Sequence, residues 1–227
     1  MRKKMKLLAI LSEVIMLSVL YSCSNNKENS GKDDEIYKIG INQIVQHSAL
    51  DSAREGFIDG LKEKGYVDGE NIEIDYENAQ GDVSIAQTIS KQFVNNEVDM
   101  IFAISTSSAQ SAYNATKEIP IVFTAVTDPV AAGIANSFES SGNNVTGMSD
   151  MVSMTEQIAL LQEIVPSIRN IGVIYNTSEA NSIVQVDELK AAAKESNLEV
   201  KEISITTVNE INQNLSANIK DIDALYV

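Results

Sequence analysis

Short runs of apolar residues alternate along most of the chain with longer stretches in which apolar residues recur every three or four positions. Residues 100–104, Met-Ile-Phe-Ala-Ile, are apolar throughout, which is typical of a strand covered on both faces of a parallel sheet. Residues 50–61 instead place Leu50, Phe57 and Leu61 on one helical face, and Gly65 is expected to end that helix. This alternation predicts an α/β fold.

The same pattern continues to the last residue. Capping boxes are expected at Ser84/Gln87, Ser153/Glu156 and Thr207/Glu210, and each would open a helix. Five strand–helix units in a row predict a doubly wound parallel sheet, because right-handed crossovers join such strands. The strands are expected at 38–45, 72–76, 100–104, 120–123, 144–148, 171–175, 198–205 and 224–227. The helices between them are expected at about 50–61, 84–93, from about 109, 153–166, 178–196 and 207–219.

The order of elements restarts after residue 150, which predicts two lobes. We expect an N-terminal α/β lobe at 36–150 and a partial C-terminal α/β lobe at 151–227. The apolar run 224–227 is expected to begin another buried strand, and nothing follows it in this sequence. The second lobe is therefore expected to be incomplete, with the chain truncated at its C-terminus.

The first 35 residues have a different composition. Residues 1–22 begin with basic side chains and continue with an apolar stretch at 7–20, shorter than the ~20 residues that a membrane span needs. This pattern predicts a signal peptide. Leu20-Tyr-Ser-Cys23 looks like the lipobox of bacterial lipoproteins, which implies that Cys23 is lipidated. Residues 23–35 are then a polar tether, and the protein is expected on the extracytoplasmic face of the cell membrane, anchored by its lipid.

Charge and residue counts exclude several classes of function. The formal net charge of −15 argues against binding to nucleic acid and to anionic lipid surfaces. Cys23 is the single cysteine and His47 the single histidine, so neither an intrachain disulfide nor a cysteine- or histidine-based zinc site can form. No Walker or dinucleotide-binding glycine pattern is present, so we expect no phosphate cofactor. We also expect no metal site.

Hydroxyl and carboxylate side chains gather where the predicted strands end. Ser105, Thr106 and Ser107 follow one strand and precede a helix, whose partly positive start suits a carboxylate. Asp128 follows the next strand. Two such loops at the carboxyl ends of neighbouring strands favour a small zwitterionic ligand. The alternative is that the serines only cap the helix and Asp128 only caps the turn at Pro129.

The remaining strand ends complete the predicted site. A catalytic triad of His47, Asp51 and Ser105 is the rival hypothesis, but no G-x-S-x-G elbow supports it, and we expect a protein that is not an enzyme. The segment 78–82 is better explained as a turn on Gly81 than as a metal loop. The candidate ligand-binding residues are Gln46, His47, Ser105, Thr106, Ser107, Thr124, Val126, Asp128, Ser149, Asn176 and Glu179.

Several phrases occur in a fixed order between Lys38 and Val227. They are Asn78-Ala-Gln-Gly-Asp82, Ser105-Thr-x-x-Ala109-Gln110, Thr124-Ala-Val-Thr-Asp-Pro-Val130, Asn144-Val-Thr-Gly147 and Ile171-Gly-Val-Ile-Tyr-Asn176. Together they resemble the ABC-transporter substrate-binding lipoproteins of the tryptophan/tyrosine-binding type. The resemblance implies a periplasmic-binding-protein fold of type I, in which two α/β lobes close on a ligand. It also implies that the last part of lobe two, and the segment that returns to lobe one, are absent from this chain.

These observations predict an extracytoplasmic solute-binding lipoprotein. It would capture a small ligand, most consistent with an aromatic amino acid, and deliver it to the permease of an ABC importer. We expect a monomer whose contact with the membrane is the lipid on Cys23. The alternatives are a lipoprotein that senses a ligand for a signalling receptor, and a binder of another solute such as a sugar or nucleoside. Sugar pockets usually stack aromatic rings on the sugar, and this chain has no tryptophan.

Overall fold

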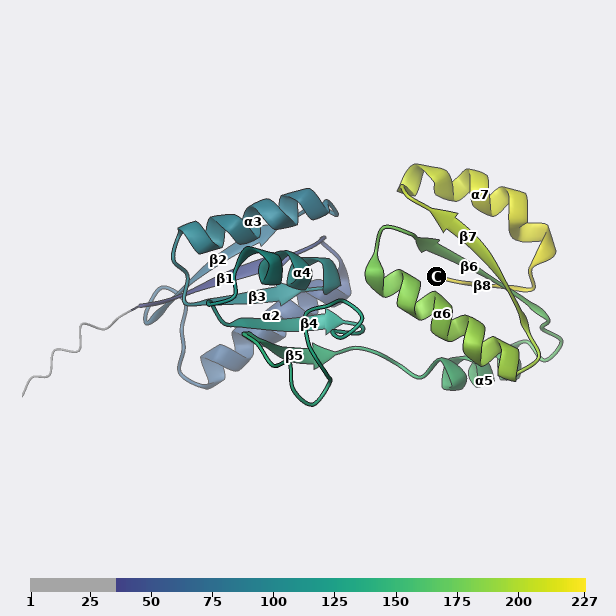
Figure 1. Cartoon of the computed structure of the whole chain (residues 1–227), viewed down its shortest axis with the longest axis horizontal. Helices are drawn as coiled ribbons and strands as arrows, with labels where there is room; N and C mark the ends of the chain where they lie inside the picture. The colour runs from purple at the N-terminus through teal and green to yellow at the C-terminus, as the bar shows by residue number, and fades with distance from the viewer. Residues whose placement is uncertain (1–35) are drawn as a thin grey trace, which may run out of the picture. The chain divides into compact units, whose positions relative to one another are not determined.

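A computed structural model of the protein describes residues 36–227. These residues form two parallel sheets, each with helices on both faces (Figure 1). The predicted signal peptide, the tether and Cys23 lie outside the described residues. No helix of the described part has both the length and the hydrophobicity needed to cross a membrane.

The first sheet has five strands in the order β2-β1-β3-β4-β5, and every neighbouring pair is parallel. This confirms the predicted doubly wound α/β sheet. The strand order reverses between β1 and β3, so the loops that follow these two strands diverge and leave room for a ligand. The strands are β1 (Tyr37–Gln43), β2 (Ile72–Asn78), β3 (Met100–Ile104), β4 (Ile121–Val126) and β5 (Val145–Ser149).

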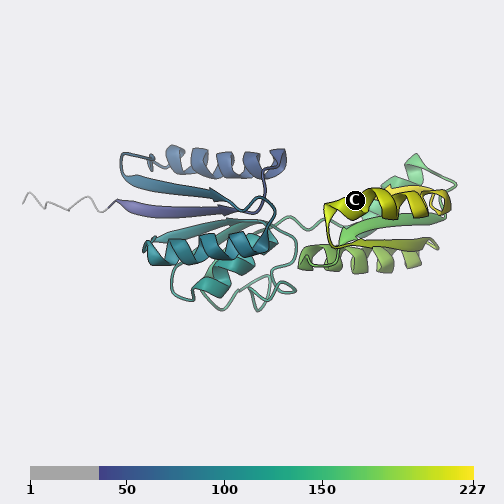
Figure 2. The ribbon, with the colours of Figure 1, turned by 90° about the horizontal axis from the view of Figure 1, so that it is seen from above.

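Helix α2 (Ser48–Glu63) covers one face of this sheet, while α3 (Val83–Asn95) and α4 (Thr106–Ala115) cover the other (Figure 2). Strand β3 is buried on both faces, as its continuous apolar run predicts. Phe102 packs under α2, where its ring stacks on Phe57 with the centroids 3.8 Å apart. Ile101 joins the core under α3 and α4 instead. Alternate residues of one strand thus supply two separate cores.

The second sheet has three parallel strands in the order β7-β6-β8. Helix α6 covers one face of this sheet and α7 the other (Figure 2). Helix α5 packs against α6 through Met154, Ile158 and Leu189. The strands are β6 (Asn170–Asn176), β7 (Glu199–Ile205) and β8 (Ala224–Tyr226). The helices are α5 (Met154–Ile164), α6 (Ala180–Glu195) and α7 (Ile211–Asn218), with short 3-10 turns at Val208–Glu210 and Ile219–Asp221.

Some details of the elements differ from the sequence-based expectations. The strand expected at 224–227 is present as β8, and within the described residues it pairs with β6 alone, so it forms an edge of the second sheet. Ile164 continues the apolar spacing of Ile158 and Leu161 along α5, which predicts an inward position, yet it is 68% exposed in the last turn of this helix. The cap of α3 is Asp82 rather than Ser84, since its carboxylate accepts hydrogen bonds from the Ser84 and Ile85 amides.

Candidate functional site at the carboxyl ends of the strands

The carboxyl ends of β3 and β4 contain two residues in unusual backbone conformations. Ser105 directly follows β3 with φ 98° and ψ 162°, and Ala125 lies in β4 with φ 54°. Residues other than glycine rarely adopt such angles, and strain of this kind concentrates at ligand clamps and active sites. The Ser105 amide donates to the carbonyl of Thr124 at 3.0 Å, which ties the two loops together. The strain therefore lies where the sequence predicts a site.

Helix α4 begins at Thr106, three residues before the predicted start at Ala109, so the serines form its first turn. Ser105 is the cap, and its Oγ accepts from the Ser108 amide at 3.5 Å. Thr106 is buried and Ser107 is half-buried. Within residues 36–227, neither of their hydroxyls forms a hydrogen bond, and first-turn amides have no acceptor inside their own helix. The helix start thus offers amide and hydroxyl donors to an anionic group.

The loop after β4 carries a carboxylate that has one occupied oxygen. Asp128 Oδ1 accepts from the amides of Val130 and Ala131 at 2.8 and 2.9 Å, which is the turn-capping role weighed as the alternative. Its Oδ2 forms no hydrogen bond with any described residue. A half-buried carboxylate with a free oxygen can still bind an ammonium group, so capping and ligand binding are compatible for Asp128.

The other candidates in this loop differ in accessibility. Thr124 is half-buried, whereas the Val126 side chain is fully buried in the core and leaves only its backbone for a ligand. Thr127 is 5% exposed, and its Oγ1 accepts from Gln185 Nε2 of α6 at 3.3 Å. Ser149 at the end of β5 donates its hydroxyl to the Thr127 carbonyl at 2.5 Å. Thr127, directly after β4, is therefore held by contacts to both its side chain and its backbone.

The residues after β1 do not form a catalytic triad. His47 caps α2, where its Nδ1 accepts from the Ala49 amide at 3.3 Å, and both Gln46 and His47 are exposed. The Asp51 carboxylate accepts from Gln43 and Arg54 at 2.8 and 3.3 Å rather than from His47. With its carboxylate partner engaged elsewhere, His47 is not arranged as a general base.

In the second sheet, Asn176 and Glu179 form a compact polar loop. Asn176 donates to Glu179 Oε1 at 2.9 Å, and its own Oδ1 accepts from the Ser178 amide at 3.0 Å. Both residues line a cavity of about 250 Å³ at the carboxyl end of this sheet, whose walls also include Val186 and Tyr226. Burial raises the pKa of the Tyr226 phenol, so its hydroxyl stays protonated. It donates to Gln157 Oε1 at 2.8 Å, which leaves its oxygen to accept from a ligand.

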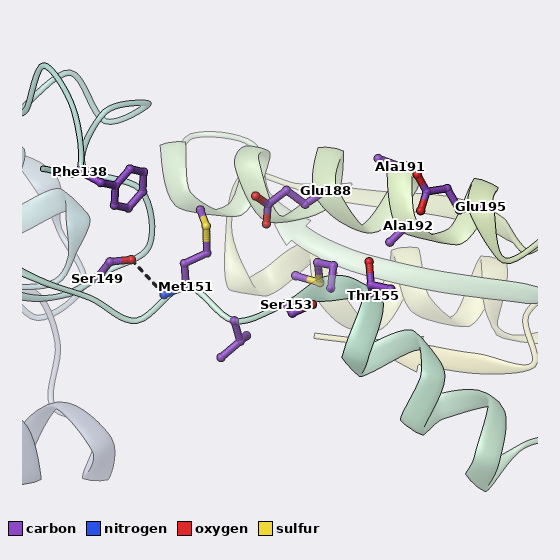
Figure 3. A pocket seen from close by; sticks show the side chains of 11 residues that line it. Phe138, Ser149, Met151, Ser153, Thr155, Glu188, Ala191, Ala192 and Glu195 are labelled. Atoms are coloured by element: carbon purple, nitrogen blue, oxygen red, sulfur yellow. Dashed lines mark hydrogen bonds between the residues drawn. The ribbon is translucent and has the colours of Figure 1, made fainter.

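A larger cavity of about 610 Å³ lies along the linker between β5 and α5 (Figure 3). It is lined by Ser149 and Met151, by Phe138 of the loop before β5, and by Glu188 and Ala192 of α6. The Met151 amide donates to the Ser149 hydroxyl at 3.1 Å, which fixes the start of the linker. Of the predicted ligand-binding residues only Ser149 lines this cavity, so the predicted site and this cavity are largely separate.

Sequence reasoning missed several polar residues that the fold brings to this region. Asn42 and Gln43 at the end of β1 are fully buried, and Gln185 reaches Thr127 from α6. The pair Asn42-Gln43 interrupts an apolar strand, which was a usable signal. Gln185 gave none, because its partner lies 58 residues away in the sequence. Among residues 36–227, no three His, Cys, Asp or Glu side chains are grouped so that they could hold a metal ion.

Comparison with known proteins identifies the family. Residues 38–227 match the family described as ABC transporter substrate binding protein. A tyrosine-binding protein of Clostridioides difficile (strain R20291) is 49% identical over 235 residues, which cover 100% of this chain and 68% of that protein.

Two solved structures have a similar fold. The ABC domain from Streptococcus pneumonia in complex with L-Trp is 38% identical with a TM-score of 0.81, over 84% of this chain and 64% of that one. A ligand-free, open substrate-binding protein with adhesive properties from Clostridium difficile is 52% identical with a TM-score of 0.63, over 85% of this chain and 65% of that one.

This chain therefore spans about two thirds of the length of these relatives. The predicted two-lobed fold of the type I periplasmic binding proteins is confirmed, and the second lobe is only partly represented. Because the family match covers nearly all of the described residues, the chain belongs to the ABC transporter substrate-binding proteins, which are solute-binding proteins and not enzymes.

Proposed function

We propose that this protein captures an aromatic amino acid, L-tyrosine or L-tryptophan, outside the cytoplasm and delivers it to an ABC importer. The observation that carries the choice of ligand is the 49% identity, over the whole chain, to a tyrosine-binding protein. The 38% identity to a protein solved with L-Trp supports the same ligand class.

The geometry of the first sheet supports an amino-acid backbone as the common feature of the ligand. The start of α4 offers free donors for the carboxylate at Thr106 and Ser107, and Asp128 Oδ2 offers an acceptor for the ammonium group. Adjacent strands lie ~4.8 Å apart, so their carboxyl-end loops can bind the two ends of one amino acid. Charged groups that pair in a desolvated site contribute to both affinity and orientation.

The cavity in the second sheet suits an aromatic ring. Apolar side chains such as Val186 and Ile205 form much of its wall, while Asn176, Glu179 and the Tyr226 hydroxyl supply polar atoms. Ligand pockets commonly combine apolar walls with a few polar groups that fix orientation. A phenol or indole has the same combination of an apolar body and one polar atom.

Retention at the membrane follows from the N-terminal segment. We assign the lipid attachment to Cys23, with residues 24–35 as the tether between the lipid and the folded part. The strongly acidic chain has little electrostatic attraction to anionic lipids, so a covalent anchor would be the means of keeping it near the permease.

A thermal-shift screen of the full-length protein without residues 1–22 tests this function. We expect stabilisation by L-tyrosine or L-tryptophan, ~2.7 kcal/mol at a ligand concentration a hundredfold above Kd. Tyramine, which lacks the carboxylate, and 3-(4-hydroxyphenyl)propionate, which lacks the amine, should stabilise much less. Stabilisation by a sugar or nucleoside, with none by any amino acid, would overturn the proposal.

A further inference from the structure

Four buried polar groups connect β1, α3 and α4 inside the first sheet's core. Asn42 Nδ2 donates to the Ala86 carbonyl and to Ser90 Oγ, both at 2.9 Å. On the other side, Asn42 Oδ1 accepts from Ser108 Oγ at 3.2 Å. Asn42, Ser90 and Ser108 are each 0% exposed, so the carboxamide bridges two helices with no access to water.

The Asn42–Ser108 bond acts on the first turn of α4. Ser108 is the third residue of this helix, and its amide is also the group capped by Ser105 Oγ. Its side chain and its backbone are therefore held by different partners, Asn42 from the sheet and Ser105 from the loop. Thr106 and Ser107 lie between Ser105 and Ser108, and their amides and hydroxyls face no protein acceptor within the described residues.

A serine in the first turn of an exposed helix would need no such partner. Burying an amide and two hydroxyls costs free energy unless each finds a hydrogen bond, and an apolar residue at position 42 would avoid that cost. A fully satisfied buried network instead fixes one arrangement of the elements that it joins. Asn42 selects the orientation of α4 relative to β1, and hence of the donors at its start.

We infer that Asn42 is a positioning residue for ligand binding, which acts through Ser108 to hold the carboxylate-binding turn of α4 in place. The expected effect on ligand affinity rests on the proposed function. The structural part of the inference, that Asn42 fixes the first turn of α4, does not depend on any ligand. The network offers a matched pair of variants. Ser108→Ala removes the hydrogen bond between Asn42 and α4, on the side of the site, and Ser90→Ala removes the hydrogen bond between Asn42 and α3, on the side away from it.

Hydrogen exchange on the full-length protein tests the structural half. Ser108→Ala and Asn42→Ser should each speed exchange at the amides of residues 108–112 by about tenfold, the factor that corresponds to one lost buried hydrogen bond. Ser90→Ala should leave exchange in this segment unchanged, even where it lowers the melting temperature. Equal acceleration in α3 and α4 for Ser108→Ala and Ser90→Ala would mean that the network is only part of the core.

Calorimetry with L-tyrosine and L-tryptophan tests the functional half. Ser108→Ala should weaken binding about tenfold, Ser90→Ala should leave the affinity unchanged, and the double variant Asn42→Ser/Ser108→Ala should be no weaker than Asn42→Ser alone. Unchanged affinity in Ser108→Ala would overturn the positioning role. If the wild-type protein binds neither amino acid, the proposed function fails, and the exchange comparison still decides whether Asn42 fixes the turn.

Discussion

The strained backbone of Ser105 allows a prediction with an unusual sign. At φ 98° and ψ 162°, Ser105 occupies a region that is essentially restricted to glycine, and such strain costs about 1–3 kcal/mol. Ser105→Gly removes this strain. Glycine's greater freedom in the unfolded chain offsets about 0.4–1 kcal/mol of the gain. Loss of the 3.5 Å cap to the Ser108 amide offsets a few tenths more. We expect the free energy of unfolding to rise by about 1 kcal/mol.

Ser153 provides the matched control, because it caps α5 with an unstrained backbone. Its φ is −65° and its Oγ accepts from the Glu156 amide at 3.3 Å. Ser153→Gly should lower the free energy of unfolding by a few tenths to about 1 kcal/mol. Urea denaturation followed by circular dichroism measures both variants. If Ser105→Gly destabilises the protein as much as Ser153→Gly does, the strain at Ser105 is absent and the reasoning fails.

Three further predictions follow from other parts of the chain. Cys23→Ser should release the protein from membranes without unfolding it, and fractionation that finds the variant still membrane-bound would refute the lipid anchor. Gly40→Ala should destabilise by about 1–3 kcal/mol, because its Cβ would lie 2.6 Å from the ring of buried Phe93. Gly56→Ala, at an exposed position of α2, should stabilise by about 0.5–1 kcal/mol. Equal effects of the two variants in denaturant melts would contradict this packing. Hydrogen bonds from Lys190 and Tyr175 lower the pKa of Glu202, so the stability that these contacts contribute is present above pH 4.5 and is lost as the pH falls through the lowered pKa. Glu202→Gln should therefore flatten the acid decline of the melting temperature between pH 5 and 2. An unchanged decline would count against these contacts of Glu202.

Sequence patterns predicted the elements and the topology of the first sheet well, because burial leaves a direct mark on them. The unbroken apolar run of β3 is typical of a strand covered on both faces, and the structure places it at the centre of the sheet. Periodic apolar positions in α2 likewise matched the core that packs on Phe102. Such local signals do not depend on knowing which distant segments meet.

Predictions failed where the outcome depends on a choice between neighbouring residues or on a distant partner. Several adjacent hydroxyls and carboxylates can each cap a helix, so α3 begins at Asp82 instead of Ser84 and α4 begins three residues early.

The sequence predicts the candidate site only in outline, and its ligand-binding role stays a prediction. Its serine turn and Asp128 follow from their place after adjacent strands. The buried Asn42–Ser108 contact spans 66 residues, and it could not be read from the sequence without the fold.

The central claim is that Asp128 binds the ammonium group of an amino acid whose carboxylate lies at the start of α4. Isothermal titration calorimetry of L-tyrosine and L-tryptophan against Asp128→Asn tests it most directly, since asparagine keeps an acceptor for the Val130 and Ala131 amides but lacks the charge. We predict a loss of about 2 kcal/mol or more in binding free energy, with an unchanged melting temperature without ligand, while Asp59→Asn on the exposed face of α2 binds normally. Wild-type affinity in Asp128→Asn would contradict the account and leave Asp128 as the cap of its turn.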